Sequence, residues 1–219
     1  MKALWRRLVI FGFRLLYNEL AWLYDPVSYV VSQGKWRQWQ ATLWPYLPAR
    51  GRVLEVAPGP GHLLVRLAMG GYEAVGLDLS PAMLRLARRR LRRRGLTVPL
   101  CRGRAEALPF APGRFDAVVV TFPTGFAYDP RWIGQLPRLL KEDGRLVMVD
   151  TSRFAAGTLA QRLLEWLYRI TGQRGPAPDL AAPLEAGGLR ARQEWVEVGN
   201  TAARLLVAQR QGLSRRKSG

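Results

Sequence analysis

The chain has 219 residues, enough for one sizeable domain and short for two, and 48% of them are apolar, which excludes collagen-like and disordered classes. It contains a single cysteine, Cys101, and a single histidine, His62. These counts exclude an internal disulfide framework and a zinc site built on cysteines. They leave chemistry in which the protein binds a substrate and a cofactor and orients them.

The formal net charge is +18, from 34 basic and 16 acidic residues. Such a surface attracts polyanions, either nucleic acid or anionic lipid. Asparagine occurs only twice, and nearly all of the basic residues are arginines, a bias that genome composition or a hot habitat also produces. Composition therefore leaves two explanations for the charge, one functional and one compositional.

Residues 2–17 have the pattern of an amphipathic helix, in which an apolar stripe lies beside basic residues: Leu4, Leu8, Phe11 and Leu15 beside Lys2, Arg6, Arg7 and Arg14. The apolar run is short and no small-residue cleavage site follows it, so we expect no export signal. We also find no run of about 18 apolar residues that would span a bilayer. We expect a cytoplasmic protein whose first helix packs on the domain or contacts the inner face of the membrane through residues 1–17.

Residues 18–47 are rich in aromatic side chains and end at Pro45 and Pro48, after which strands and helices alternate. We expect strands at 52–57, 73–78, 97–102, 115–121, 145–151, 190–198 and 203–210, and helices at 62–69, 80–94, 131–140 and 158–170. This alternation predicts an α/β fold with a parallel sheet, and the tight turn at Gly199-Asn200 makes the terminal strand pair antiparallel. We divide the chain into an N-terminal helical segment (1–48), a cofactor-binding domain (49–212) and a basic tail (213–219).

The stretch VLEVAPGPGH, residues 53–62, joins an apolar strand to a helix through a turn with two glycines. Such a turn lets the backbone approach a nucleotide at the carboxyl edge of a sheet, and Gly59 and Gly61 lack the Cβ atoms that would block it. Glu55 precedes the turn, where its carboxylate would repel a phosphate and attract an ammonium group. The expected cofactor therefore carries a positive amino group near this loop.

Asp78 ends the next predicted strand, just before Ser80 and Pro81 start a helix. A carboxylate at this position can accept hydrogen bonds from both hydroxyls of a ribose. It can also act as a favourable charge at the N-terminus of the helix, and the two roles are compatible.

Four blocks in this order and spacing resemble the successive motifs of class I S-adenosylmethionine-dependent methyltransferases: VLEVAPGPGHLL, GLDLSPAMLRLAR, GRAEALPFAPGRFDAVVVTF and LPRLLKEDGRLVMVD. They are most similar to the branch that includes the ubiquinone/menaquinone C-methyltransferases, and the resemblance covers residues 50–151. It implies a Rossmann-like sheet of seven strands in the order 3-2-1-4-5-7-6, with an antiparallel last strand, helices on both faces and an N-terminal helical lid. It also implies that the cofactor is S-adenosyl-L-methionine, and with one cysteine and one histidine we expect no metal site.

The resemblance assigns cofactor-binding roles to ten positions. Glu55 and the backbone of Ala57, Gly59 and Gly61 would hold the methionine portion, and Asp78 the ribose. Leu79 and Met83 would pack on the adenine faces, the backbone near Ala105 would meet its edge, and Glu106 and Thr121 complete the set.

Two positions depart from the family pattern. Ala57 replaces the first glycine of the loop, which we expect to be tolerated if φ stays negative. Arg104 stands where an acid often accepts a hydrogen bond from the adenine amino group, and an arginine has no acceptor. Glu106 or the backbone alone would then read the base.

The loop 121–129 faces the transferable methyl group in this family. It lacks the Asn/Asp-Pro-Pro-aromatic signature of enzymes that methylate exocyclic base nitrogens, and Cys101 lies outside it, which argues against a cytosine C5 mechanism. In-line methyl transfer needs alignment more than a base. The candidate bases are Tyr24, Asp25, Tyr128 and Asp129, each of which also has a structural explanation.

A small hydrophobic or lipid-like acceptor accounts for the aromatic segment, the basic N-terminus and the cationic surface together. The stretch 24–28, YDPVS, also resembles the entry motif of the quinone methyltransferase branch. RNA methylation is the alternative, motivated by six arginines within residues 88–94, and a non-catalytic cofactor-binding protein is a third interpretation. The sequence thus predicts a methyltransferase and leaves its acceptor open.

Overall fold

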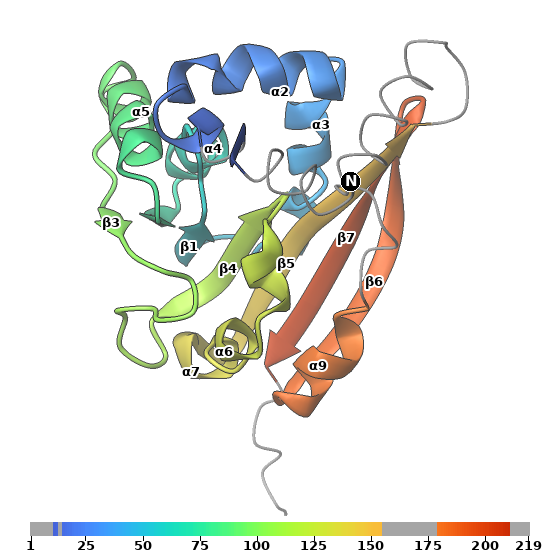
Figure 1. The fold of residues 1–219 in the computed structure, drawn as a ribbon. Coiled ribbons are helices and arrows are strands. Elements are labelled where there is room, and N and C mark those ends of the chain that lie inside the picture. Colours follow the sequence, from blue (N-terminus) through green and yellow to red (C-terminus); the bar gives the residue numbers. More distant parts are fainter. Residues whose placement is uncertain (1–10, 13–14, 155–178, 211–219) are drawn as a thin grey trace, which may run out of the picture.

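The computed structural model describes residues 11–12, 15–154 and 179–210, and its centre is a seven-stranded sheet (Figure 1). The strands are β1 (Arg52–Val56), β2 (Glu73–Asp78), β3 (Leu100–Arg102), β4 (Phe115–Thr121), β5 (Leu140–Phe154), β6 (Leu189–Val198) and β7 (Thr201–Arg210). Their order is β3-β2-β1-β4-β5-β7-β6, with β1 to β5 parallel and β7 antiparallel to both of its neighbours. This confirms the fold class and the strand order that the resemblance implied.

Helices cover both faces of the sheet. They are η1 (Ala21–Leu23), α2 (Tyr24–Ser32), α3 (Trp36–Ala41), η2 (Trp44–Tyr46), α4 (His62–Met69), α5 (Pro81–Arg92), η3 (Gly125–Tyr128), α6 (Pro130–Ile133), α7 (Leu136–Leu139) and α9 (Ala181–Ala186). Alternate residues of a strand point to opposite faces, so Val119 joins the core under α3 and α4, and Val118 joins the core under α6, α7 and α9. None of the helices within the described ranges is both long and apolar enough to cross a bilayer.

Several predicted elements have different bounds in the structure. The helix predicted over 131–140 is replaced by the short helices α6 and α7 and the start of β5, because Pro137 lacks the N–H group that a continuous helix needs. The strand predicted over 97–102 begins only at Leu100, after Pro99, which cannot donate to a ladder. Helix α9 was not predicted, and the helix predicted over 158–170 lies outside the described residues.

β5 is longer than predicted at both of its ends. Its pairing with β7 continues to Phe154, which lies opposite Thr201, beyond the predicted end at residue 151. The register shifts between Val149 and Thr151, so Asp150 lies in an irregularity of the ladder. Antiparallel pairing thus extends β5 beyond the part that its parallel neighbour β4 covers.

The N-terminal segment packs at the end of the molecule toward which β4 runs (Figure 1). Trp39 of α3 donates a hydrogen bond from Nε1 to Thr201 Oγ1 at 2.8 Å, and Gln40 donates from Nε2 to Thr121 Oγ1 at 3.0 Å. These bonds tie α3 to the C-terminal end of β4 and the start of β7. Most of residues 1–17, and the tail 213–219, lie outside the described residues.

Candidate functional site

The turn between β1 and α4 has a left-handed backbone at Ala57 (φ +55°), Gly59 (φ +54°) and Gly61 (φ +80°). The condition under which alanine would replace the glycine without strain, a negative φ, is therefore not met at Ala57. Its N–H donates to the carbonyl of Leu77 at 2.8 Å, which holds the start of the turn against the end of β2. A left-handed alanine costs about 1 to 2 kcal/mol, so the surrounding structure stores strain at this position.

Gly59 and Gly61 are required for different reasons. A Cβ atom added at Gly59 would meet no atom within 4 Å, so the turn borders open space there. A Cβ atom added at Gly61 would lie 2.8 Å from the Cβ of Ala87 in α5. Gly59 therefore keeps space free for a ligand, whereas Gly61 lets the turn pack against α5 and does not clear a nucleotide path as the sequence suggested.

Glu55 lies at the penultimate position of β1 and is only 1% exposed. Its Oε2 atom is buried and has no hydrogen-bond partner among the described residues. Burial, together with the negative charge of Asp78, raises the pKa of Glu55 to about 8. An unpartnered buried carboxyl oxygen beside an open turn fits a ligand that brings a cationic hydrogen-bond donor.

Asp78 connects the end of β2 to the same turn. Its Oδ2 accepts a hydrogen bond from the N–H of Gly59 at 3.1 Å, and its Oδ1 accepts one from the N–H of Ser80 at 2.8 Å. Burial raises the pKa of Asp78, although these backbone N–H groups act in the opposite direction. Each carboxylate oxygen keeps a further lone pair, so the group can still accept from a ligand hydroxyl.

Two residues of the N-terminal segment reach this turn. The carbonyl of Tyr17 accepts a hydrogen bond from Ser80 Oγ at 2.6 Å, and the phenol of Tyr17 has a pKa raised by burial and by the charge of Asp78. Asp25 accepts from His62 at 2.9 Å and also pairs with Arg90 of α5. The N-terminal segment therefore covers the turn, a role of Tyr17 that no sequence signal indicated.

Of the residues expected to hold an adenine, Leu79 is exposed, Met83 and Ala105 are buried, and Glu106 is half-buried. Leu79 is 57% exposed and available to cover a ring, whereas Met83 is 1% exposed and packs against Ala21 of η1. The carbonyl of Ala105 accepts a hydrogen bond from Gln135 Nε2 at 3.3 Å, and Glu106 pairs with the guanidinium of Arg104. Of these positions, Leu79 is the most accessible to a ligand.

The C-terminal end of β4 carries a cluster of aromatic rings. Phe122, directly after Thr121, has φ +51°, and its N–H donates to the carbonyl of Val149 at 2.6 Å. Its ring centroid lies 4.2 Å from that of Trp36 and 5.8 Å from that of Trp39. A bulky residue in the left-handed region is rare and is often found at functional sites.

The candidate bases have structural partners. Asp129 accepts a hydrogen bond from the N–H of Arg131 at the start of α6 and also pairs with its guanidinium, which lowers the pKa of Asp129 to about 2. Burial favours a higher pKa for Asp25, but its bonds to His62 and Arg90 outweigh burial and lower the pKa of this carboxyl. Both carboxylates are therefore weak bases.

The two tyrosines among the candidates do not supply a stronger base. Burial and the charge of Asp150 raise the pKa of Tyr128, so its hydroxyl keeps its proton. The ring of Tyr24 lies 5.8 Å from that of Tyr17, within the covering segment. Alignment of the reactants, rather than a strong base, is what this geometry offers.

Residues 53–144 match a family model described as a methyltransferase domain. A demethylmenaquinone methyltransferase of Thermus thermophilus is 34% identical over 214 residues, which cover 85% of this chain and 97% of that protein. The ubiquinone/menaquinone biosynthesis C-methyltransferase UbiE of Allorhizobium ampelinum is 29% identical over 74% of this chain and 69% of that protein.

Solved structures show the same fold at lower identity. The YcgJ protein of Bacillus subtilis has a TM-score of 0.61 at 18% identity, covering 80% of this chain and 98% of that one. A phosphoethanolamine N-methyltransferase of Haemonchus contortus, in complex with S-adenosylhomocysteine, has a TM-score of 0.62 at 17% identity, covering 81% of this chain and 53% of that one.

Proposed function

Because the chain belongs to the class I S-adenosylmethionine-dependent methyltransferases, in the branch of the ubiquinone/menaquinone C-methyltransferases, we propose that it methylates a ring carbon of a quinone-type acceptor. It is a methyltransferase, and its cofactor is S-adenosylmethionine. The observation that carries the proposal is the similarity to a demethylmenaquinone methyltransferase over 97% of the length of that protein.

S-adenosylmethionine supplies an electrophilic methyl group on a sulfonium when bound. The unpartnered Oε2 of Glu55 suits the ammonium group of the cofactor. Asp78, which directly precedes the exposed Leu79, suits its ribose. Gly59 keeps the space above the turn free of side chains. The residues present therefore fit the cofactor, and their task is to bind and orient it.

The aromatic cluster supports a flat acceptor. Trp36 and Phe122 are both partly buried and form a ring pair at the C-terminal end of β4, on the side of the sheet covered by α3. Aromatic walls favour an apolar ring and exclude water from it. The bound cofactor would supply the methyl group: a bond from the ring carbon to the methyl carbon would form as the sulfur–methyl bond breaks, and the displaced ring proton would pass to solvent. Alignment of the ring carbon with the methyl group is the main requirement.

Cofactor binding should release a proton from Glu55. With a pKa of about 8, this carboxyl is mostly protonated at pH 7 in the free protein, and an ammonium group would favour its ionised form. Calorimetric titration at pH 7 in two buffers of different ionisation enthalpy should therefore show about one proton released per cofactor. Glu55→Gln should release none.

The same group should make the stability of the ligand-free protein depend on pH. Its pKa is raised above that of the unfolded chain, so the contribution is full below the unfolded value and is lost as pH rises through about 8. Urea unfolding of Glu55→Gln should lack this decline. The calorimetric prediction is contradicted if Glu55→Gln releases as many protons on cofactor binding as the wild type, because another group would then titrate.

The acceptor is tested by incubating the purified protein with methyl-labelled cofactor and, separately, a short-chain demethylmenaquinol, phosphoethanolamine and transfer RNA. We expect label only on the quinol ring carbon. Trp36→Ala should lower kcat/KM for the quinol about 5- to 10-fold, the size of a lost aromatic contact, with the affinity for the cofactor unchanged.

Trp195→Ala is the matched control, because Trp195 is an exposed tryptophan of β6 that contacts Arg153. It should change neither quantity. Label on RNA or phosphoethanolamine, with none on the quinol, would overturn the proposed acceptor while leaving the methyltransferase assignment in place.

A further inference from the structure

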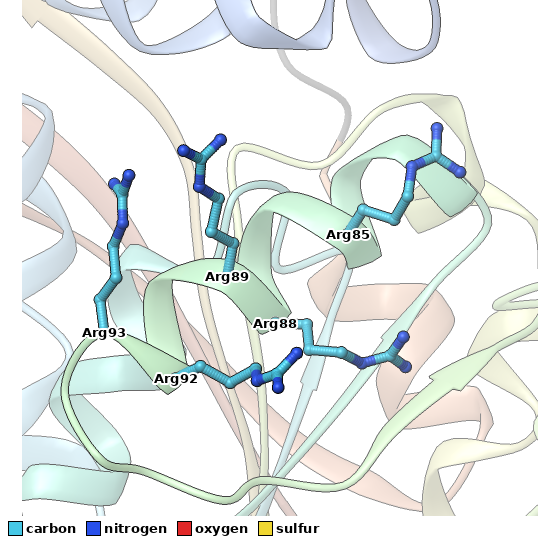
Figure 2. Close-up of a pocket in the computed structure, with 5 residues that line it drawn as sticks. All are labelled: Arg85, Arg88, Arg89, Arg92 and Arg93. Carbon is cyan, nitrogen blue, oxygen red and sulfur yellow. The ribbon is translucent and has the colours of Figure 1, made fainter.

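Five arginines on one side of α5 and on the residue that caps its C-terminus, Arg93, line a surface hollow of about 500 Å³: Arg85, Arg88, Arg89, Arg92 and Arg93 (Figure 2). Their spacing of three and four residues places them on the same side of the helix. In Figure 2 the side chains of Arg85, Arg89 and Arg93 point upward, whereas those of Arg88 and Arg92 point to the right. The opposite side of α5 holds Ala87 and Leu91, which are buried. We call these five residues the arginine face.

The arginine face has no counter-charge within the described part of the chain, where none of its five guanidinium groups forms an ion pair. The adjacent Arg90 differs, because it pairs with Asp25 of α2. Like charges four residues apart on a helix repel one another, as in the pairs Arg85–Arg89 and Arg88–Arg92. A face that retains such repulsion suits an external polyanion that would relieve it.

An exposed apolar patch lies on the neighbouring N-terminal segment. Trp22 of η1 and both Tyr29 and Val30 of α2 are each 68% exposed. η1 packs directly on α5, where Ala21 contacts Ala82 and Met83, and α2 is joined to α5 through Asp25 and Arg90. Val27 of α2 is 38% exposed, and we call Trp22, Val27, Tyr29 and Val30 the cover patch.

We propose that the arginine face and the cover patch together dock the protein on an anionic lipid bilayer. Arginines would pair with lipid phosphates, and the exposed aromatic and aliphatic side chains would enter the interface. RNA would satisfy the arginines but would give no role to Val27 and Val30, whose aliphatic side chains cannot stack on bases. The charge and the apolar surface together therefore favour lipid over nucleic acid.

The position of this docking face is suited to a membrane-borne acceptor, although the inference does not depend on what the acceptor is. Asp25 links α2 both to α5 and to His62, the first residue of α4 after the cofactor turn. α2 and α5 lie at the same end of the molecule, opposite α6, α7 and α9 (Figure 1). Docking would thus place the covered cofactor turn close to the bilayer.

The first test compares two triple variants with the same net charge. Arg85→Gln, Arg89→Gln and Arg93→Gln remove part of the arginine face, and Arg50→Gln, Arg114→Gln and Arg190→Gln remove three exposed arginines outside α5. Flotation of the full chain with phosphatidylglycerol-containing vesicles measures the partition coefficient, and phosphatidylcholine vesicles serve as the neutral reference. Equal cofactor affinity in all variants would confirm their folding.

We expect the α5 variant to bind anionic vesicles on the order of a hundredfold more weakly, since each arginine near such a surface contributes about fivefold. The control variant should lose much less. Equal losses in the two variants would overturn the proposal, because net charge alone would then explain binding.

The second test addresses the apolar part and the alternative partner. Trp22→Ser with Val30→Ser leaves the charge unchanged and should weaken vesicle binding at least tenfold, as apolar surface no longer enters the interface. Transfer RNA binding is measured for the same proteins. Loss of RNA binding in the α5 variant, with vesicle binding retained, would assign the face to nucleic acid and overturn the proposal, as would vesicle binding that is unchanged in the Trp22/Val30 variant.

Discussion

Replacing Asp150 by alanine should lower the free energy of unfolding by about 3 to 5 kcal/mol, the usual cost of removing one member of a buried ion pair. The Asp150 side chain is 1% exposed and that of Arg204 on β7 is 13% exposed. The guanidinium donates to the carboxylate from Nε at 2.9 Å and also from Nη2. In the variant, the Arg204 charge would remain buried without this carboxylate. Urea unfolding of both proteins measures the difference.

Glu197→Ala is the matched control. Glu197 of β6 pairs with Arg153 of β5 at 3.4 Å across the intervening β7, but their side chains are 71% and 56% exposed. Such a surface pair contributes about 0 to 1 kcal/mol. The double variant Asp150→Leu with Arg204→Met should recover most of the lost stability, since an apolar pair leaves no buried charge. A cost for Asp150→Ala no larger than that for Glu197→Ala would show that the pair is not effectively buried.

Gly59→Val should weaken S-adenosylmethionine binding at least a hundredfold (about 2.7 kcal/mol) while the protein stays folded. The added side chain enters the open space above the turn, where the cofactor is expected, and no protein atom lies within 4 Å of the new Cβ. A β-branched residue also resists the left-handed backbone, which would move the N–H of Gly59 away from Asp78. Calorimetric titration measures the affinity.

Gly113→Val separates backbone strain from steric exclusion. Gly113 has φ +61°, close to the +54° of Gly59, and a Cβ added there also meets no atom within 4 Å. It precedes β4 at the opposite edge of the sheet. This variant should lose similar stability and keep normal cofactor affinity. If both variants bind the cofactor equally well, the turn at Gly59 is not where the cofactor sits.

The sheet and the cofactor turn could be predicted because their signals are local. The strands β1, β2 and β4 are short apolar runs, and turn residues separate them from the helices that follow. Glu55 and Asp78 stand at or next to the ends of adjacent parallel strands, which meet at one edge of the sheet. Motif spacing therefore predicts that both carboxylates lie at the same edge of the sheet, as they do in the structure.

The contacts of the N-terminal segment could not be predicted in this way. Asp25 meets Arg90 across 65 positions and Gln40 meets Thr121 across 81, and no local pattern encodes such pairs. The left-handed backbone of Ala57 and Phe122 is likewise set by surrounding hydrogen bonds, because the intrinsic preference of both residues opposes it. The sequence makes Asp25 a candidate base, but its bonds to His62 and Arg90 give it the role of holding the N-terminal segment on the turn.

The insertion of β7 between β5 and β6 determines when the protein can finish folding during synthesis. Within the described residues β6 pairs only with β7, and Trp39 finds its acceptor, Thr201, 162 positions later. A nascent chain that has emerged only as far as β6 has an unpaired β5 edge and no acceptor for the Trp39 N–H group. Such an edge can pair with other chains, so this stage is open to aggregation. Helix α3 emerges early, but it thus gains the acceptor for its Trp39 only when β7 has been made.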